Sequence, residues 1–408
     1  MTASVLQLKC YCNEYPWGKK GNKSMAARLC ANTPRTDFTV EEDTPYAEMW
    51  MGTYPSLPSY VLSTDEELQK VIDKDPTGLL GEPVQKKFGP ANLPFLPKIL
   101  SIEKALPLQL HPNIGLAESL HAREPNKFTD PNHKPEIGLA LTEFEAFAGF
   151  KPLKDIERLL TTLEPLNKFI APIRKTDYDD QSLKFAVHEM LSLDPDEVRQ
   201  TEDALMKIPR ENFGKDEYVL DMLPRLQEQY DKTDPGTLVA LILMNYLRLP
   251  PGSAVYVPAD APHAWLHGDI VECMARSNNV LNTGFCPRAS RDDVDLFCSV
   301  LTFTPHDINE ALISSEPFEK SSNGKTRVFR PPMSEFSLLE VSIHKGEKEA
   351  WQKFDGPGIF ILTQGSGVMR SDGKEWKLEE GYTFFVGVGT ELAFEANSEF
   401  QGYFAYVE

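Results

Sequence analysis

The sequence predicts a mainly β fold that is interrupted by one helical segment. Residues 1–150 contain short apolar runs separated by turn residues, the pattern of short strands. Beyond Lys151 the apolar residues follow a helical period, and Gly214 is the only glycine between 151 and 235. Turn-rich sequence returns at Pro250 and continues towards the C-terminus, so strands are expected on both sides of the helical segment.

Local periodicity predicts the individual elements. Large and small apolar residues alternate over 144–150, which indicates a strand whose two faces differ in crowding. Apolar residues recur at helical spacing in two stripes, Ile156, Leu159, Leu160 and Leu163 in the first and Val219, Leu223, Leu226 and Tyr230 in the second. Runs at 358–362 and 382–386, with a turn at 371–374 between them, predict an antiparallel sandwich or barrel near the C-terminus.

These patterns divide the chain into three expected units. The units are a β domain of residues 1–150 and 240–320, a helical insertion of residues 151–239, and a smaller β domain of residues 321–408. The stretch around 305–335 carries the pairs Ser314-Ser315, Ser321-Ser322 and Pro331-Pro332, so we expect a domain boundary with a loose connection there. His344 is the only histidine after His306, so the C-terminal unit is expected to lack metal ligands and to have a structural role.

Composition limits the classes of partner. The 408 residues carry 42 Lys and Arg against 61 Asp and Glu, a formal net charge of −19. This acidity disfavours nucleic acid and anionic membranes as main partners, but a local basic pocket remains compatible with a phosphorylated small molecule. The longest apolar run, 238–247, is about half of what a bilayer span needs. Six cysteines without a CxxC pair indicate free thiols in a reducing compartment, so a cytoplasmic protein is expected.

Two polar residues in one predicted strand have the spacing of metal ligands. Gln109 and His111 lie two apart, so in a strand they project to the same face, while Leu108 and Leu110 project to the opposite face. An amide oxygen and an imidazole nitrogen are both competent ligands for a borderline cation such as zinc.

Two further clusters complete a possible ligand set. Glu136 follows Asn-His-Lys-Pro and opens the apolar run 137–141, and His263 follows a proline-flanked turn at the start of another strand. Each histidine alone is best interpreted as a structural residue, but together Gln109, His111, Glu136 and His263 form a possible N/O site. Such a set is structural unless a fifth position stays open for water or substrate. The titratable groups nearest these clusters in sequence are Lys98, Lys134 and Glu272.

These residues resemble the ordered motifs of the type I mannose-6-phosphate isomerase family. The motifs are Tyr-Pro-Trp-Gly at 15–18, Leu-Pro-Phe-Leu-Pro-Lys at 93–98, Pro-Leu-Gln-Leu-His-Pro at 107–112, Asn-His-Lys-Pro-Glu at 132–136, Pro-His-Ala-Trp at 262–265 and Val-Glu-Cys-Met at 271–274. The likeness covers most of the chain. It implies cupin-type β-barrels and a zinc-dependent aldose–ketose isomerase with one Zn²⁺ per chain.

The resemblance also implies roles for individual residues. It implies that Gln109, His111, Glu136 and His263 hold the zinc, and that the catalytic groups are Glu272 as proton carrier with Lys134 and His133 assisting ring opening. It implies that Lys98, Trp17, Arg288 and Asn282 contact the substrate. The reaction would interconvert mannose 6-phosphate and fructose 6-phosphate through an enediol or enediolate and so supply GDP-mannose. A monomer is expected.

The sequence departs from the family pattern at three positions. Asn278 stands where the family usually has Asp, Asn282 where it has Arg, and Pro107 where it has Ser. Loss of an arginine removes a permanent charge and a guanidinium that can donate two hydrogen bonds to a phosphate. Arg276 or Arg288 is near enough in sequence to replace it. Three alternatives therefore stand: an active isomerase, a paralogue with the same metal site but altered substrate or weak activity, and a non-catalytic module that binds zinc and sugar phosphate.

Overall fold

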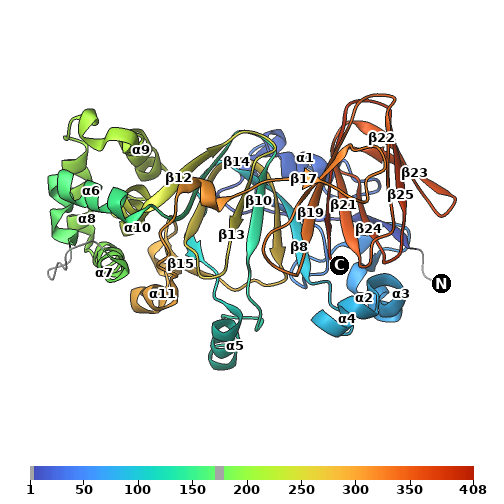
Figure 1. The fold of residues 1–408 in the computed structure, drawn as a ribbon, viewed down its shortest axis with the longest axis horizontal. Coiled ribbons are helices and arrows are strands. Elements are labelled where there is room, and N and C mark those ends of the chain that lie inside the picture. The colour runs from blue at the N-terminus through green and yellow to red at the C-terminus, as the bar shows by residue number, and fades with distance from the viewer. Residues whose placement is uncertain (1–3, 171–178) are drawn as a thin grey trace.

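The protein is elongated, with three parts along its long axis (Figure 1). The computed structural model describes residues 4–170 and 179–408. Helices form one end, a strand layer occupies the middle, and a second strand-rich region forms the other end. The predicted class, mainly β with helical segments, is confirmed.

The middle part is organised around β14 (His263–Ala275). This strand pairs antiparallel with β8 (Phe95–Ile102) and with β10 (Glu136–Ala140), whose residues are all buried. Burial on both faces explains why these segments are almost continuously apolar, and why Lys98 and Glu136 stand out in them. The other strands of this sheet are β2 (Tyr11–Asn13), β5 (Glu48–Trp50), β9 (Leu108–Leu110), β11 (Phe144–Phe150), β12 (Met244–Leu249), β13 (Ala254–Val257), β15 (Leu281–Gly284) and β16 (Leu312–Ile313).

Strand β14 changes partners at Gly268. Residues 263–267 pair with β9 and β11, whereas residues 268–275 pair with β8 and β10. Gly268 has φ +123°, and a Cβ there would lie 2.6 Å from the carbonyl oxygen of Glu143, so only glycine fits. The strand bends at Gly268. Side chains from its two halves are in contact there, since the Trp265 indole N–H donates to the Glu272 carboxylate.

The predicted helical segment forms a bundle that packs against the strand layer. Its described helices are α6 (Leu153–Thr162), α7 (Asp180–Leu191), α8 (Pro195–Leu205), α9 (Val219–Gln229) and α10 (Pro235–Leu238), and residues 171–178 of the predicted insertion lie outside the described residues. The first apolar stripe is fully buried, and Leu223 and Leu226 of the second lie in the same core as Leu108 and Leu110 of β9. A capping box between Asp194 and Glu197 starts α8. The bundle therefore supports the strand that carries Gln109.

Two antiparallel sheets form the C-terminal region. The larger contains, in order, β17 (Glu316–Pro317), β18 (Thr326–Phe329), β19 (Ser337–Ile343), β26 (Phe400–Tyr406), β21 (Gly358–Gln364), β24 (Thr383–Val386), β1 (Val5–Lys9), β6 (Tyr60–Val61) and β7 (Glu66–Glu67). The smaller contains β20 (Lys348–Trp351), β25 (Leu392–Ala396), β22 (Ser366–Ser371) and β23 (Lys374–Glu379). Trp351, with its ring centroid 4.8 Å from Phe394 and 5.3 Å from Phe404, lies in the core between them.

The structure departs from the sequence-based expectations in three places. Strand β1 pairs with β24, so the N-terminal segment belongs to the C-terminal sheet rather than to the middle layer. The stretch 305–335 contains strands β16, β17 and β18 instead of only a loose connection. The first 150 residues also contain short helices, namely α1 (Met25–Ala31), α2 (Leu68–Lys74), α3 (Pro76–Leu80), α4 (Glu82–Phe88) and α5 (Ile114–Arg123), and α11 (Val294–Val300) follows β15. Pairing between distant strands leaves no local periodicity, so β1 could not be assigned from sequence. The division at residues 150, 240 and 320 stays a prediction.

Candidate metal centre and active site

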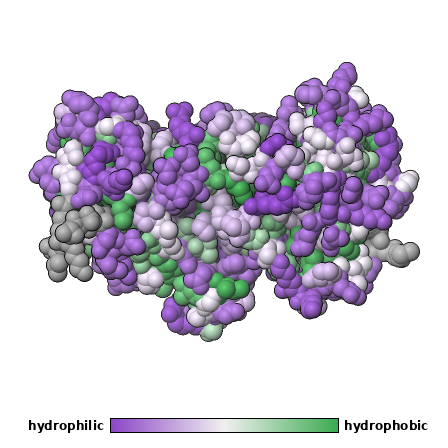
Figure 2. Space-filling model, viewed as in Figure 1, coloured by the Kyte–Doolittle hydropathy of each residue, from purple (hydrophilic) through white to green (hydrophobic). Residues whose placement is uncertain are grey.

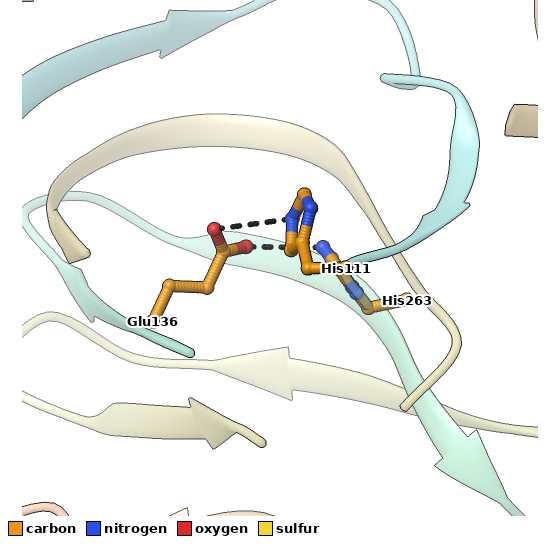
Figure 3. Close-up of side chains that lie close together, drawn as sticks. All are labelled: His111, Glu136 and His263. Carbon is orange, nitrogen blue, oxygen red and sulfur yellow. Dashed lines mark ion pairs between the residues drawn. The ribbon is translucent and has the colours of Figure 1, made fainter. Parts of the chain in front are cut away.

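Three predicted ligands meet in the interior of the middle layer. Glu136 Oε1 lies 3.0 Å from His263 Nε2, and Glu136 Oε2 lies 3.4 Å from His111 Nε2 (Figure 3). All donor atoms of this triad lie within 4.8 Å of one another, and each side chain is at most 1% exposed. Residues separated by up to 152 positions thus converge on one point.

Each of these three predicted ligands lies at the end of a strand. His111 directly follows β9, Glu136 is the first residue of β10, and His263 is the first residue of β14. The strand partners fix the backbone at these positions, since β9 pairs with the start of β14 and β10 pairs with its second half. Residues at strand ends can point into the interior without disturbing the ladder of backbone hydrogen bonds.

The second nitrogen of each imidazole is held by a backbone carbonyl. His111 Nδ1 lies 2.8 Å from the Asn279 oxygen, and His263 Nδ1 lies 3.1 Å from the Ala261 oxygen. With Nδ1–H donated in this way, Nε2 carries a lone pair that faces the carboxylate. The two Nε2 atoms and both Glu136 oxygens are buried without a hydrogen-bond partner. These nitrogen and oxygen atoms all have lone pairs and face one another with no hydrogen between them, an arrangement that a bound cation would satisfy.

Charge in the site follows the same logic. Burial lowers the pKa of His111 to about 3, with Lys134 acting in the same direction, so this imidazole is neutral and available as a ligand at neutral pH. Burial raises the pKa of Glu136, but Lys134 and the two histidines lower it by more than burial raises it. The net pKa therefore lies well below the ordinary value. The triad therefore presents two nitrogen donors and one anionic carboxylate, a set that zinc prefers.

The predicted fourth ligand lies beside the triad. Gln109 is 8% exposed, and its backbone is in register with His263 on one side and with Asn282 of β15 on the other. Directly opposed residues of an antiparallel pair project to the same face, so the Gln109 side chain shares a face with that of Asn282. The Asn282 side-chain oxygen is buried without a hydrogen-bond partner.

A buried lysine between two carboxylates lies next to the metal centre. Lys98 Nζ is 3.0 Å from Glu272 Oε2 and 3.2 Å from Glu48 Oε2, and all three side chains are almost fully buried. Indole N–H groups complete the cluster, because Trp265 Nε1 donates to Glu272 Oε1 over 2.9 Å and Trp50 Nε1 donates to Glu48 Oε2 over 2.6 Å. Each carboxylate thus has one indole donor and shares one cation.

The electrostatics of this cluster favour proton transfer at Glu272. Burial raises the pKa of Glu272, and the Glu136 charge raises it further, against the opposing effect of Lys98. Burial lowers the pKa of Lys98, but Glu272 and Glu48 raise it more, so the lysine stays a cation. A carboxylate with a raised pKa and a fixed orientation has the properties of a general base.

The loop before Glu136 carries two predicted catalytic residues, and the structure brings only one of them to the triad. Lys134 Nζ lies 3.7 Å from Glu136 Oε2. His133 is not among the converging donors, because its Nε2 lies 2.6 Å from Glu335 Oε1 in the segment that leads to the C-terminal sheets.

Two predicted substrate residues line one cavity. Trp17 and Arg288 lie in the wall of a hollow of about 590 Å³ between the strand layer and the helices, together with Pro107, Lys104 and Arg291. Arg291 forms an ion pair with Asp234, with Nη2 3.0 Å from Oδ2, whereas Arg288 is exposed to solvent. Among the described groups, the cationic side chains of this wall offer positions for an anion.

Sequence reasoning missed two members of the site. Glu48 and Trp50 were not singled out, although a glutamate inside the apolar run 46–51 was a visible signal. The role of Trp265 as a donor to Glu272 was also missed, because the bend at Gly268 that brings them together is a tertiary feature.

Comparisons with known proteins extend over the whole chain. Residues 5–153 match the family described as phosphomannose isomerase type I, catalytic domain. The chain is 37% identical to the mannose-6-phosphate isomerase of Schizosaccharomyces pombe over 97% of both chains, and 34% identical to that of Saccharomyces cerevisiae over 100% of both. A zinc-bound mannose 6-phosphate isomerase of known structure is 25% identical, covers 100% of both chains and has a TM-score of 0.81.

Proposed function

The chain belongs to the type I phosphomannose isomerase family, and we propose on this premise that it interconverts mannose 6-phosphate and fructose 6-phosphate. The observation that carries the proposal is the buried triad of His111, Glu136 and His263 beside the Lys98–Glu272 pair. The full-length similarity to mannose-6-phosphate isomerases supports the same reaction.

The metal would be held by Gln109, His111, Glu136 and His263, one zinc ion per chain. Support comes from the unpartnered donor atoms of the triad and from the zinc-bound structural relative. A bound zinc ion stabilises negative charge on the sugar oxygens as a Lewis acid.

Glu272 would carry the proton between the two carbons. Isomerisation removes the proton at C2 of the aldose and returns it to C1, so one carboxylate serves as base and then as acid. Lys98 opposes the rise in the pKa of Glu272 that burial causes, and the indole of Trp265 donates to one of its oxygens. Lys134, beside Glu136, would assist opening of the sugar ring through its positive charge.

The substrate would extend into the cavity that Trp17 and Arg288 line. A flat indole face suits the apolar side of a hexose, and a guanidinium suits a phosphate. Asn282 would face the sugar or the metal ligand Gln109, since both side chains share one face of the β9–β15 pair.

We further propose a monomer in the cytoplasm. Figure 2 shows a largely hydrophilic face with small separate hydrophobic areas, one of them over α5, which agrees with a monomer. All six cysteines are free and buried, as a reducing compartment permits. None of the described helices is long and apolar enough to cross a bilayer.

A second candidate function keeps the metal and changes the substrate. Its support is Asn282, a neutral amide beside Gln109 where the family resemblance places an arginine. A different phosphorylated sugar, or a slower reaction, would follow from the missing charge.

A coupled assay with mannose 6-phosphate separates these functions. Activity that a chelator removes and zinc restores supports the first proposal. Zinc binding without turnover of mannose 6-phosphate rejects it, and a panel of other sugar phosphates then distinguishes an altered isomerase from a non-catalytic module. Light scattering at micromolar concentration tests the monomer.

A further inference from the structure

A side chain of the C-terminal region, Glu335, contacts the loop 130–136 that leads to the predicted metal ligand Glu136. Glu335 lies between β18 and β19, and its Oε1 is 2.6 Å from His133 Nε2. Its second oxygen accepts the backbone N–H of Ser334 at 3.0 Å, so the carboxylate is held on both sides. The pair is partly buried, with His133 22% and Glu335 13% exposed.

The opposite side of the same loop is bound to the connection between β14 and β15. The side chain of Asn279 donates to the backbone oxygens of Asp130 and Asn132, and the side chain of Asn132 donates to the oxygen of Arg276. Loop 130–136 is therefore held between two anchors, one within the middle layer and one from the C-terminal region.

Loop 130–136 is in contact with the candidate metal centre. Lys134 follows His133 directly and lies 3.7 Å from Glu136, and Glu136 ends the loop. Asn279, whose side chain anchors the loop, also contacts Nδ1 of His111 through its backbone oxygen. A shift of the loop would move a ligand carboxylate relative to the imidazoles, and small shifts weaken metal sites.

His133 lines a hollow next to the C-terminal region. A cavity of about 600 Å³ is lined by His133, Pro135 and Tyr256 together with residues 331–335, and none of the four predicted metal ligands, Lys98 or Glu272 lines it. The imidazole is thus directed towards the C-terminal segment, whereas proton transfer requires contact with the reacting carbons.

We infer that Glu335 is a positioning residue for the isomerase site, and that His133 acts as its hydrogen-bond partner and fastens loop 130–136 instead of carrying a proton. The inference rests on the proposed function, since it concerns the same metal centre. It assigns the C-terminal region a part in holding that centre, beyond packing.

A double-mutant cycle tests this inference. The variants are Glu335→Gln, His133→Gln and the double substitution, and the readouts are the zinc Kd from chelator competition, kcat and KM. Each single variant is expected to weaken zinc binding on the order of tenfold, as for other residues that orient metal ligands. The double variant is expected to lose no more than either single one, because both remove the same contact.

The control is a His–Glu pair of the same chemistry far from the site. His344 Nδ1 lies 2.8 Å from Glu399 Oε2, and both side chains are exposed. Glu399→Gln is expected to change the zinc Kd and kcat by less than about twofold, since exposed pairs contribute little. Thermal unfolding of all variants, measured with and without zinc, distinguishes loss of the loop contact from global unfolding.

Three results would overturn the inference. A loss of kcat of about 10²–10⁴-fold in His133→Gln, with Glu335→Gln near wild type, would identify His133 as a proton carrier. Additive losses in the double variant, or a zinc Kd within about twofold of wild type in both singles, would show that the pair does not hold the loop. The zinc Kd decides these outcomes even if mannose 6-phosphate is not turned over, so failure of the proposed function remains distinguishable.

Discussion

Replacing Lys98 with methionine removes the positive charge that contacts both buried carboxylates, Glu48 and Glu272. The two N–O distances are 3.2 and 3.0 Å, and the lysine is 4% exposed. Methionine keeps the apolar length of the side chain over the Trp50 ring, which Nζ approaches to 4.8 Å, so packing changes little. The substitution therefore isolates the electrostatic contribution.

The expected magnitude follows from burial. At an effective dielectric constant of about 20, each charge pair at about 3 Å has a gross attraction of roughly 5 kcal/mol, which desolvation largely offsets. Removing one partner leaves buried charge uncompensated, so Lys98→Met should lower the free energy of unfolding by about 3–5 kcal/mol. The matched control is Lys320→Met, because Lys320 also lies between two carboxylates, Asp355 and Glu408, but near the surface. That change should cost less than about 1 kcal/mol.

The pH dependence gives a second measurement. Burial already raises the pKa of Glu272, and without Lys98 it will rise further, so the folded variant takes up a proton that the unfolded chain does not hold. An acid that binds its proton more tightly when folded makes stability fall as pH increases between the unfolded and folded pKa values. Urea unfolding at about pH 6 and about pH 8 should show the larger loss at the higher pH. Equal stability of Lys98→Met and wild type at both pH values would refute the assignment of a buried shared charge.

Three further predictions concern catalysis and the metal. Glu272→Gln should lower kcat by about 10²–10⁴-fold while zinc content, measured by atomic spectroscopy, stays at the wild-type level; an unchanged kcat would exclude Glu272 as the proton carrier. Trp265→Phe removes the indole donor to the carboxylate, so the pKa of Glu272 should rise and the acidic limb of the pH profile of kcat should move to higher pH; a limb that stays in place would contradict this contact. His263→Ala should abolish zinc binding, and zinc at about 1,000 times the wild-type Kd should stabilise the wild type by about 4 kcal/mol but leave this variant unchanged, as followed by thermal unfolding.

Side-chain type, spacing and the family resemblance together singled out three residues that the structure brings together, His111, Glu136 and His263. His111, Glu136 and His263 lie within or directly beside buried strands, and a protein interior tolerates such residues only where they are satisfied. The same reasoning predicted the strand at 144–150 and the helices that bury Ile156 and Leu223. These are local properties, because strand and helix periods repeat within a few residues.

The partners of the predicted groups could not be obtained in this way. Glu48 beside Lys98 and Glu335 beside His133 lie 50 and 202 positions away in the chain, and no local pattern connects them. The predicted role of His133 came from the family resemblance, whereas the structure pairs its imidazole with the C-terminal segment. Adjacent residues in an irregular loop need not point to the same side.

By itself, the sequence determined which side chains are chemically able to bind a cation or move a proton, and it indicated the strongly periodic strands and helices such as 144–150 and 153–162. Only the tertiary structure decided which of those groups meet. The reason is that direct ion pairs and hydrogen bonds need their atoms within about 3 Å of one another. Bringing remote segments to that distance depends on strand pairing and on bends such as the one at Gly268. The placement of β1 in the C-terminal sheet has the same origin, since its ladder depends on backbone groups of β24 more than 370 positions away.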